Sequence, residues 1–392
     1  MVERAKPDTR HQFPCANCGA LLNFRPGTEV LECPYCQHRT PIPRSDVEIR
    51  EWDFQSALQR LAEARRAQPE EETIEAVRCD ACGAQFEFEQ DIHSGACPYC
   101  GHPVVLGTGD KKLFKPRGLL PFKVTESAAK EQFRRWLRGL WFAPGGLKEY
   151  ARDDRRLNGI YLPFWTYDSD TTTDYEGERG IAYQEPRVFV TIRNGRRVTQ
   201  QRMVTKIRWT PVRGVVSRFF DDVLVGASRS LPRQIADRLA PWDLDNLLAF
   251  KEDYLSGFGS QAYQVELDEG FERARSVMDR VIRSDIAKDI GGDAQRIHRF
   301  QTRHRATTFK HILLPIWSAG FRYKKRTYHF VVNARTGKVR GERPYSPWKI
   351  AIAVGIAILV LVAAVIAFQY YEIFDQSYLI ETVPHFSEGM FR

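Results

Sequence analysis

Eight cysteines are the residues of this sequence with the clearest chemical potential, and they form two sets of identical spacing. Each set reads C-x2-C-x14-C-x2-C. The first set is Cys15, Cys18, Cys33 and Cys36, and the second is Cys79, Cys82, Cys97 and Cys100. Two thiolates separated by two residues can reach one ion from a tight turn, and two such pairs complete a tetrahedron of sulfurs at about 2.3 Å. The spacing therefore predicts two bound zinc ions (Zn2+) per chain, one in each set.

Four cysteines fill the coordination shell of zinc and leave no position for water or substrate, so both sites are expected to be structural. Four thiolates can also bind iron, but neither set has the spacing of the common iron–sulfur motifs. His38 and His102 follow the second pairs at matching positions, and we interpret them as packing or surface residues. The sequence contains no G-x4-G-K-[ST], G-x-S-x-G or H-E-x-x-H motif. We therefore expect no enzymatic activity and no small-molecule substrate.

The cysteines belong to an internal repeat. The segments CANCGA and CPYCQH return 64 residues later as CDACGA and CPYCGH. Gly19 and Gly83 follow the first pairs, where a tight turn favours glycine. We expect one zinc ribbon over residues 1–43 and a second over 77–107, each built on a short β-hairpin. Between the two ribbons, residues 44–76 are expected to form a helix over 52–67, capped by Asp53, and then an acidic linker.

Residues 108–345 are predicted to form a basic α+β core domain. Apolar periodicity predicts helices over 125–140, 241–250 and 267–290. β-Branched and aromatic runs predict strands over 160–167, 187–193, 201–209, 219–225, 312–316, 320–323, 328–333 and 338–342. The similar segments LPFW (162–165) and LPIW (314–317) indicate either equivalent strands in two half-domains or convergence, and their prolines indicate an edge or bulge. Asp221 and Asp222 are interpreted as a turn or bulge pair, because neighbours in a strand point to opposite faces.

One segment near the C-terminus is too apolar for a soluble loop. Residues 350–368 are 19 residues without a charge, long enough to cross about 30 Å of hydrocarbon. We expect a transmembrane helix over 346–370 and an extracytoplasmic tail over 371–392; the alternative is a buried core helix. Basic residues precede the span (Arg340, Arg343, Lys349) and acidic residues follow it (Glu372, Asp375). The positive-inside rule therefore predicts a single-pass protein with its N-terminus in the cytoplasm.

Charge is distributed unevenly and bears on the partners. Residues 1–110 carry 11 Lys/Arg and 18 Asp/Glu, whereas residues 111–349 carry 46 and 27, a net charge of +19. Each site of four thiolates around zinc adds a formal −2, so the ribbons favour protein contacts over phosphate. The basic core suits an anionic lipid surface or nucleic acid. The predicted helix carrying Arg134, Arg135 and Arg138 among aromatic residues either packs amphipathically or rests on lipid headgroups.

Several of these elements together resemble a known family. They are the paired CxxC…CPYC units, LPFW at 162–165, the block 219–225, Gly257-Phe258 with Ala262-Tyr263, Leu314-Pro315 with Trp317, and Val332-Asn333 with Thr336-Gly337. This set resembles bacterial membrane-anchored proteins with paired zinc ribbons, often labelled primosomal protein N′ (replication factor Y)-like or transcription-factor-IIB-type zinc finger proteins. The similarity to the helicase is limited to the cysteines, because the motor motifs are absent. The resemblance implies the bacterial inner (cytoplasmic) membrane and partners of the SPFH/flotillin-like or phage-shock type.

The sequence thus predicts a multidomain protein with two small β zinc ribbons, an α+β core domain and one C-terminal transmembrane helix. The predicted function is that of a membrane-anchored scaffold or adaptor that recruits cytoplasmic or membrane-associated protein partners. The alternative is a membrane-tethered nucleic-acid-binding protein that uses the basic core.

Overall fold

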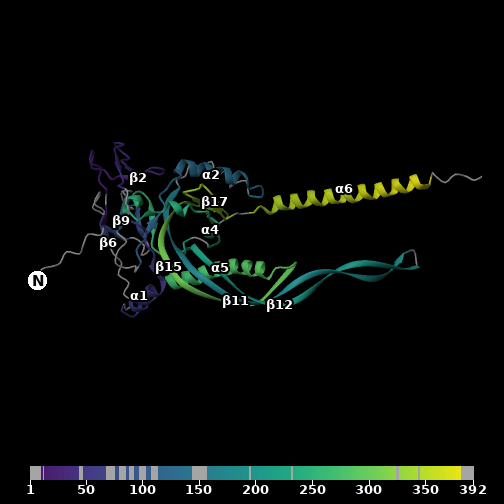
Figure 1. Ribbon diagram of the computed structural model, residues 1–392. Helices are drawn as coiled ribbons and strands as arrows, with labels where there is room; N and C mark the ends of the chain where they lie inside the picture. The colour runs from purple at the N-terminus through teal and green to yellow at the C-terminus, as the bar shows by residue number, and fades with distance from the viewer. Residues whose placement is uncertain are drawn as a thin grey trace, which may run out of the picture. The chain divides into compact units, whose positions relative to one another are not determined.

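The computed structural model describes residues 10–11, 13–43, 47–67, 76–78, 85–87, 92–96, 103–106, 114–143, 157–193, 196–230, 233–323, 326–342 and 345–380 (Figure 1). The chain forms two compact units. The first comprises Met1–Gln132, Arg156–Gly320 and His329–Gly341, and the second Phe133–Arg155, Phe321–Tyr328 and Glu342–Arg392. The protein is therefore multidomain, with a sheet-rich core in the first unit and a long apolar helix in the second.

A mixed sheet forms the body of the first unit. Its strand order is β1-β9-β8-β14-β11-β15-β10-β13. In addition, β12 pairs with β11, β5 and β16 pair with β15, and β17 pairs with β16. The strands are β1 (Arg10–His11), β5 (Trp52–Asp53), β8 (Ile92–Ala96), β9 (Pro103–Leu106), β10 (Gly118–Leu119), β11 (Asn158–Arg193), β12 (Arg196–Gly226), β13 (Leu248–Ala249), β14 (Gly259–Gln261), β15 (Ala294–Tyr323), β16 (Arg326–Asn333) and β17 (Val339–Gly341). Strands from the cysteine-bearing region and from the basic core thus share one sheet.

Three strands are much longer than the sequence predicts. The predicted strands 160–167 and 187–193 are parts of β11, 201–209 and 219–225 are parts of β12, and 312–316 and 320–323 are parts of β15. The predicted end of the first of these strands at residue 167 was wrong, because the polar sequence after Tyr167 is typical of a loop. In the structure its threonines alternate inward, where Thr171 and Thr173 are buried, and β11 is paired on both sides by β12 and β15.

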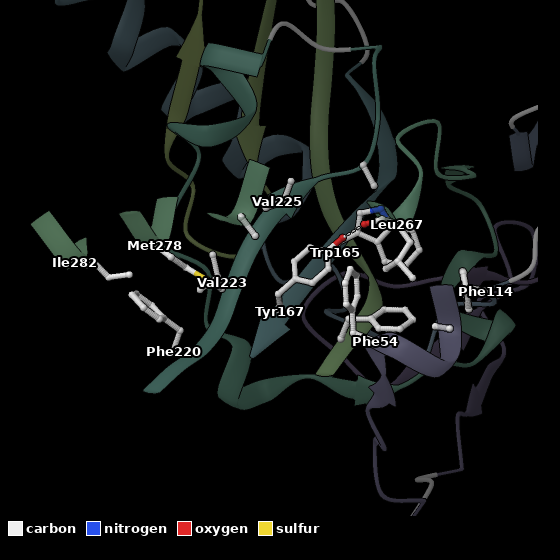
Figure 2. Packing of buried hydrophobic residues seen from close by; sticks show 14 of the residues in the cluster. Phe54, Phe114, Trp165, Tyr167, Phe220, Val223, Val225, Leu267, Met278 and Ile282 are labelled. Atoms are coloured by element: carbon white, nitrogen blue, oxygen red, sulfur yellow. Dashed lines mark hydrogen bonds between the residues drawn. The ribbon is translucent and has the colours of Figure 1, made fainter. Parts of the chain in front are cut away.

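Helix α5 (Leu267–Ile290) covers this sheet and matches the predicted 267–290. Its buried residues recur every four positions, at Ala274, Met278, Ile282, Ile286 and Ile290, which is the spacing of one helix face. They pack in one cluster with Trp165, Tyr167 and Val223 of the long strands (Figure 2). The indole N–H of Trp165 donates to the Val265 carbonyl at 2.9 Å, and the Tyr167 hydroxyl donates to the Leu267 carbonyl at 2.8 Å.

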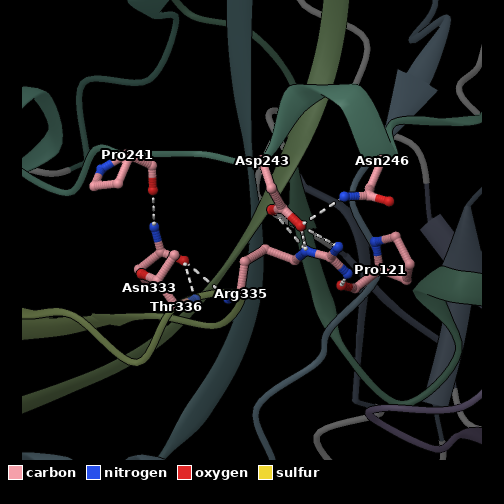
Figure 3. Close-up of polar contacts among 7 residues, drawn as sticks. All are labelled: Pro121, Pro241, Asp243, Asn246, Asn333, Arg335 and Thr336. Carbon is pink, nitrogen blue, oxygen red and sulfur yellow. Dashed lines mark hydrogen bonds and ion pairs between the residues drawn. The ribbon is translucent and has the colours of Figure 1, made fainter.

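The predicted helix over 241–250 is wrong. This segment contains the single turn η1 (Leu244–Asn246) and strand β13, which pairs with β10. A polar network holds it instead against the β16–β17 turn (Figure 3). The Asn333 side-chain amide donates to the carbonyls of Leu239 and Pro241 at 3.1 and 3.2 Å, and Arg335 Nε donates to Asp243 at 2.9 Å. These tertiary contacts outweigh the local helical pattern.

The two LPxW segments lie side by side. Leu162 of β11 is the register partner of Leu314 of β15, so the two segments are antiparallel neighbours in the sheet. On its other side, β11 pairs with β14 up to Tyr161 and with β12 from Phe164 onward. Pro163 falls in the gap between these two partners, a local edge where its missing N–H costs no ladder hydrogen bond.

The other helices of the described residues are α1 (Phe54–Ala67), α2 (Glu126–Arg138), α4 (Arg233–Asp237), η2 (Glu252–Leu255) and α6 (Pro347–Ile380). The predicted cap of α1 is confirmed, since Asp53 Oδ1 accepts the Ser56 N–H at 2.8 Å. Within α6, Pro347–Phe368 is long and apolar enough to span a membrane, and none of it is buried inside the protein. A buried core helix, the alternative interpretation, is thereby disfavoured.

Candidate metal centre

The four cysteines of the first set converge on one point. The Cys15 and Cys36 sulfurs lie 3.6 Å apart, the Cys18 and Cys33 sulfurs 3.5 Å apart, and all four lie within 4.8 Å of one another. A zinc ion with sulfurs at about 2.3 Å requires S–S edges of roughly 3.8 Å, whereas a disulfide would require about 2.05 Å. The donor set and its spacing therefore fit a tetrahedral metal site; the four cysteines form one cluster that could hold a metal ion, and zinc as its occupant stays a prediction.

Two backbone turns of the same geometry present these sulfurs. The Cys15 N–H donates to the Ala20 carbonyl and the Gly19 N–H to the Cys15 carbonyl, at 2.7 and 2.9 Å. The Cys33 turn repeats both bonds with His38 and Gln37, at 2.9 and 3.0 Å. Gly19 and Gln37, at equivalent positions, both have positive φ, of 73° and 59°. The turn is thus fixed by its backbone bonds, and glycine is present at only one of the two places where its freedom is useful.

A three-stranded sheet carries the turns. It consists of β2 (Asn23–Phe24), β3 (Val30–Glu32) and β4 (Arg39–Pro41). The second cysteine pair lies in the β3–β4 connection, so folding of this hairpin brings it to the first pair. Leu22, Phe24 and Leu31 are buried and give the ribbon a small apolar core. Such a small core buries little apolar surface, and a metal held by the four cysteines would add most of the ribbon's folding free energy.

One side of the ribbon is packed on the core domain. The Phe24 N–H donates to the Ser256 carbonyl at 2.9 Å, and the Ser256 hydroxyl donates to the Leu22 carbonyl at 2.6 Å. The Phe24 ring packs edge-on against Tyr254, with centroids 5.1 Å apart. Cys15 and Cys33 are buried on this ribbon, whereas Cys18 is exposed. The ribbon thus has a packed side and a free side, and the free side includes one cysteine of the cluster, Cys18.

Charges near the site are arranged in a compact group. The Glu32 carboxylate accepts hydrogen bonds from both Arg25 and Arg39, the latter at 3.0 Å, and the Arg25 hydrogen bond is the main cause of the lowered pKa of Glu32. The hydrogen bond to the Asn17 side chain, with that to the His38 backbone, lowers the pKa of the Cys36 thiol to about 6. Within the same cluster, hydrogen bonds with Cys36 and Cys33 raise the pKa of Cys18 to about 12, so the four thiols titrate as a group and not singly.

The second set, Cys79, Cys82, Cys97 and Cys100, lies outside the described residues. The strands around its second pair are described, however. Ser94, Gly95 and Ala96 of β8 pair with Val105, Val104 and Pro103 of β9. Val30, Leu31 and Glu32 of β3 pair with Pro41, Thr40 and Arg39 of β4. Every partner in one hairpin is 64 residues from its counterpart, so the sequence repeat is also a repeat of β-sheet register. Further strands β6 (Ala76–Arg78) and β7 (Gln85–Glu87) flank the first pair.

An acidic cluster is the second place where three ligand-type side chains meet among the described residues. Asp168 faces Asp221 and Asp222 across a bulge, because Tyr167 pairs with Val223 and Ser169 with Phe220. The bulge interpretation of the two adjacent aspartates is therefore confirmed. The Lys310 ammonium lies 2.8 Å from Asp222 Oδ1 and 2.7 Å from Glu51 Oε1.

Lys310 therefore already supplies the positive charge of the acidic cluster. Burial, with a contribution from the neighbouring Glu51, raises the pKa of Asp168 to about 7. The half-buried Glu51–Lys310 pair links the segment before α1 to β15, alongside the pairing of β5 with β15. We interpret the cluster as a structural ion-pair group. Sequence reasoning missed it because Glu51 and Lys310 are 259 residues apart and no motif connects them.

Comparison with known proteins adds one distant relative. The chain is 24% identical over 239 residues to an uncharacterized protein, YdjG, of Bacillus subtilis (strain 168). The match covers 60% of this chain and 66% of YdjG, so it spans just under two thirds of that protein's length. No protein-family model matches the chain. No solved structure matches it either.

Proposed function

We propose that the protein is a membrane-anchored scaffold, without enzymatic activity, whose zinc ribbons bind protein partners. The observation that carries this proposal is the free side of the first ribbon. Its two turns, residues 16–18 and 34–38, contain no Lys, Arg, Asp or Glu. The Tyr35 side chain projects from it with 72% of its surface exposed. An exposed tyrosine beside an uncharged rim is typical of an anchor in a protein–protein interface.

The ribbon's charges support protein rather than nucleic acid as its ligand. Arg25 and Arg39, the two basic residues of 13–43, both form ion pairs with Glu32. A zinc–tetrathiolate centre adds a formal −2 nearby, and phosphates are repelled by such a centre. The repeated hairpin register supports a second zinc ion held by Cys79, Cys82, Cys97 and Cys100, with the same structural role.

The membrane assignment rests on α6 and its N-terminal surroundings in the second unit. The Lys349 ammonium donates to the Ala143 carbonyl at 2.7 Å, and the Ser346 N–H to the Phe142 carbonyl at 2.8 Å. The exposed rings of Trp141 and Trp348 belong to these two contacting segments. Aromatic and lysine side chains gather in this way at the polar boundary of a bilayer.

The charges around the span set the orientation. With basic residues before the span and acidic residues after it, the N-terminus lies in the cytoplasm and residues 371–392 lie outside. We further propose, from the resemblance described above, that the membrane is the bacterial inner membrane. On the same ground, the chain belongs to the paired-zinc-ribbon family and its partners are of the SPFH/flotillin-like or phage-shock type.

Site-specific photo-crosslinking tests the docking surface. A crosslinking amino acid replaces Tyr35 in the full chain in its native membrane, and Val47, which is similarly exposed, serves as the matched control position. We expect a discrete protein adduct at position 35 and none at 47, with zinc content unchanged. Loss of the adduct in Cys18→Ser would show that it needs the folded ribbon. Equal labelling at both positions would refute a docking role for the ribbon.

A membrane-tethered nucleic-acid-binding protein is the second candidate, and the net charge of +19 over residues 111–349 favours it. The purified full chain in nanodiscs is titrated with duplex DNA at two salt concentrations. Tight binding with a steep loss of affinity at higher salt would place this candidate first. We expect the full chain to bind duplex DNA only weakly, because in the proposed scaffold the basic core contacts lipid and protein.

A further inference from the structure

A two-stranded ribbon extends from the core sheet. Pairing of β11 with β15 ends at Gly180 and Ala294, whereas pairing of β11 with β12 continues to Arg193 and Arg196 (Figure 1). We call residues 181–190 of β11 and 199–208 of β12 the distal ribbon. No other described strand pairs with it. A two-stranded ribbon alone is at best marginally stable in water, so this one is expected to gain a partner surface.

The distal ribbon has one uncharged face. Cross-strand partners share a face, and the face that includes Val188 carries ten residues, none of them charged: Ala182, Gln184, Pro186, Val188, Val190, Thr199, Gln201, Met203, Thr205 and Ile207. Val188, Val190 and Met203 expose 65%, 61% and 61% of their surfaces. Three large apolar side chains that are neighbours on one face are thus in contact with solvent. Such a patch indicates an interaction site.

The opposite face carries every charge of the distal ribbon. Arg187 stands directly opposite Arg202, and Lys206 and Arg208 lie on the same face. Glu185 is the one acidic residue of these two segments; it is paired with Lys206 and lies 3.9 Å from Arg187. Two arginines directly opposite each other destabilise an isolated ribbon. Glu185 offsets only part of the charge of Arg187, Arg202, Lys206 and Arg208, so further anions beside this face would stabilise it. The tip adds Arg193, Arg196 and Arg197 in the sequence.

We propose that the distal ribbon binds an anionic phospholipid bilayer, with its apolar side chains in the headgroup–acyl boundary and its arginines on the phosphates. This inference rests on the proposed membrane anchoring, since the span keeps a bilayer within reach of the rest of the chain. Two-stranded ribbons twist strongly, and arginine stems reach sideways past apolar neighbours. Side chains from both faces can therefore enter one membrane interface.

The distal ribbon has an apolar face and a positively charged face, and the ligand it binds is expected to interact with both. A nucleic acid would use the arginines and leave Val188, Val190 and Met203 in water. A second copy of the chain would cover the uncharged face and leave the excess positive charge of Arg187 and Arg202, beyond what Glu185 offsets, without a further anion. An anionic bilayer supplies an apolar layer and phosphates together, and it is the ligand that satisfies both faces.

Hydrogen–deuterium exchange tests the proposal on the full chain, reconstituted at one copy per nanodisc. The lipids are phosphatidylcholine alone or phosphatidylcholine with phosphatidylglycerol. We expect amides of 181–190 and 199–208 to exchange roughly tenfold more slowly with phosphatidylglycerol, and the difference to shrink at high salt. In Arg187→Gln/Arg202→Gln the protection should be largely lost. Val188→Asp should lose it too, whereas the matched control Val281→Asp, on the exposed side of α5, should keep it.

Other outcomes would overturn the proposal in identifiable ways. Equal amide exchange rates of the distal ribbon with and without phosphatidylglycerol would show that it does not bind anionic lipid. Protection that appears only with two chains per disc would assign the surface to a second copy. Protection that appears only when duplex DNA is added would assign it to nucleic acid. Crosslinking at Tyr35 and exchange at the distal ribbon are measured independently, so the scaffold function and the lipid contact can each fail while the other stands.

Discussion

Replacing Asp168 with asparagine should change how the stability of the core depends on pH. Asp168 is 5% exposed, and its Oδ1 accepts the Asp222 N–H at 2.6 Å. Its pKa rises from 3.8 to about 7, chiefly through burial and then through Glu51. At 1.36 kcal/mol per tenfold change in proton affinity, the ionised form costs about 4 kcal/mol above pH 7. Asparagine keeps the acceptor oxygen and removes that cost.

The direction of the effect follows from proton binding. Between pH 3.8 and about 7 the folded state holds a proton on Asp168 that the unfolded state has released, so stability falls as pH rises. From pH 5.5 to 8.5 the wild-type protein should lose about 2 kcal/mol through this group, and Asp168→Asn should not. His304, whose pKa is lowered by burial, titrates in both proteins, so the difference between them reports Asp168 together with the Glu51 carboxyl that is hydrogen-bonded to it.

Urea unfolding of the full chain in detergent, followed by tryptophan fluorescence and pulse proteolysis, measures this difference. The variant should have a higher midpoint at pH 8.5, by about 1 M, and the gap should narrow toward pH 5.5. A gap of the same size at both pH values would show that Asp168 does not titrate in this range. A lower midpoint for the variant at pH 8.5 would show that the carboxylate's attraction to Lys310 outweighs its burial.

Three further predictions follow from other parts of the chain. Cys33→Ser should reduce zinc from about two ions per chain to about one, measured by elemental analysis, and expose residues 13–43 to protease; unchanged resistance would refute the metal dependence of the ribbon. Asn333→Ala should lower the free energy of unfolding by about 2–4 kcal/mol, because it leaves the Leu239 and Pro241 carbonyls without donors; a urea midpoint within error of wild type would contradict the network in Figure 3. A reporter fused after Arg392 should be active only outside the cytoplasm, and cytoplasmic activity would reverse the proposed orientation.

The sequence predicts best where a local pattern dictates the structure. Cysteine spacing located the first site because two tight turns and one hairpin suffice to assemble it. The period of apolar residues in 267–290 marked α5 because one face of a helix must be buried. The segment 241–250 has a similar period, yet Asn333 and Arg335, about 90 residues away, hold it in another conformation. No local pattern contains that information.

Long-range partners also explain what was missed in the sheet. The strand β11 continues through a polar stretch because β12 and β15 pair with it on both sides, and neither is adjacent to that stretch in the sequence. The group around Lys310 depends in the same way on Glu51, Asp168 and Asp222 from three distant segments. The second cysteine set remains a prediction, supported by the common register of the two hairpins.

The contact between Ser256 and Leu22 also has a consequence for the order of synthesis. These residues are 234 positions apart. At 5–20 residues per second, the ribosome completes Leu22 roughly 10–50 s before Ser256 exists. During that interval the first ribbon has no core to pack against, and its own apolar interior is small. In the proposed zinc-bound form, metal capture would keep the ribbon folded while the rest of the chain is made. The supply of zinc during translation, rather than at equilibrium, would therefore govern the yield of correctly assembled protein.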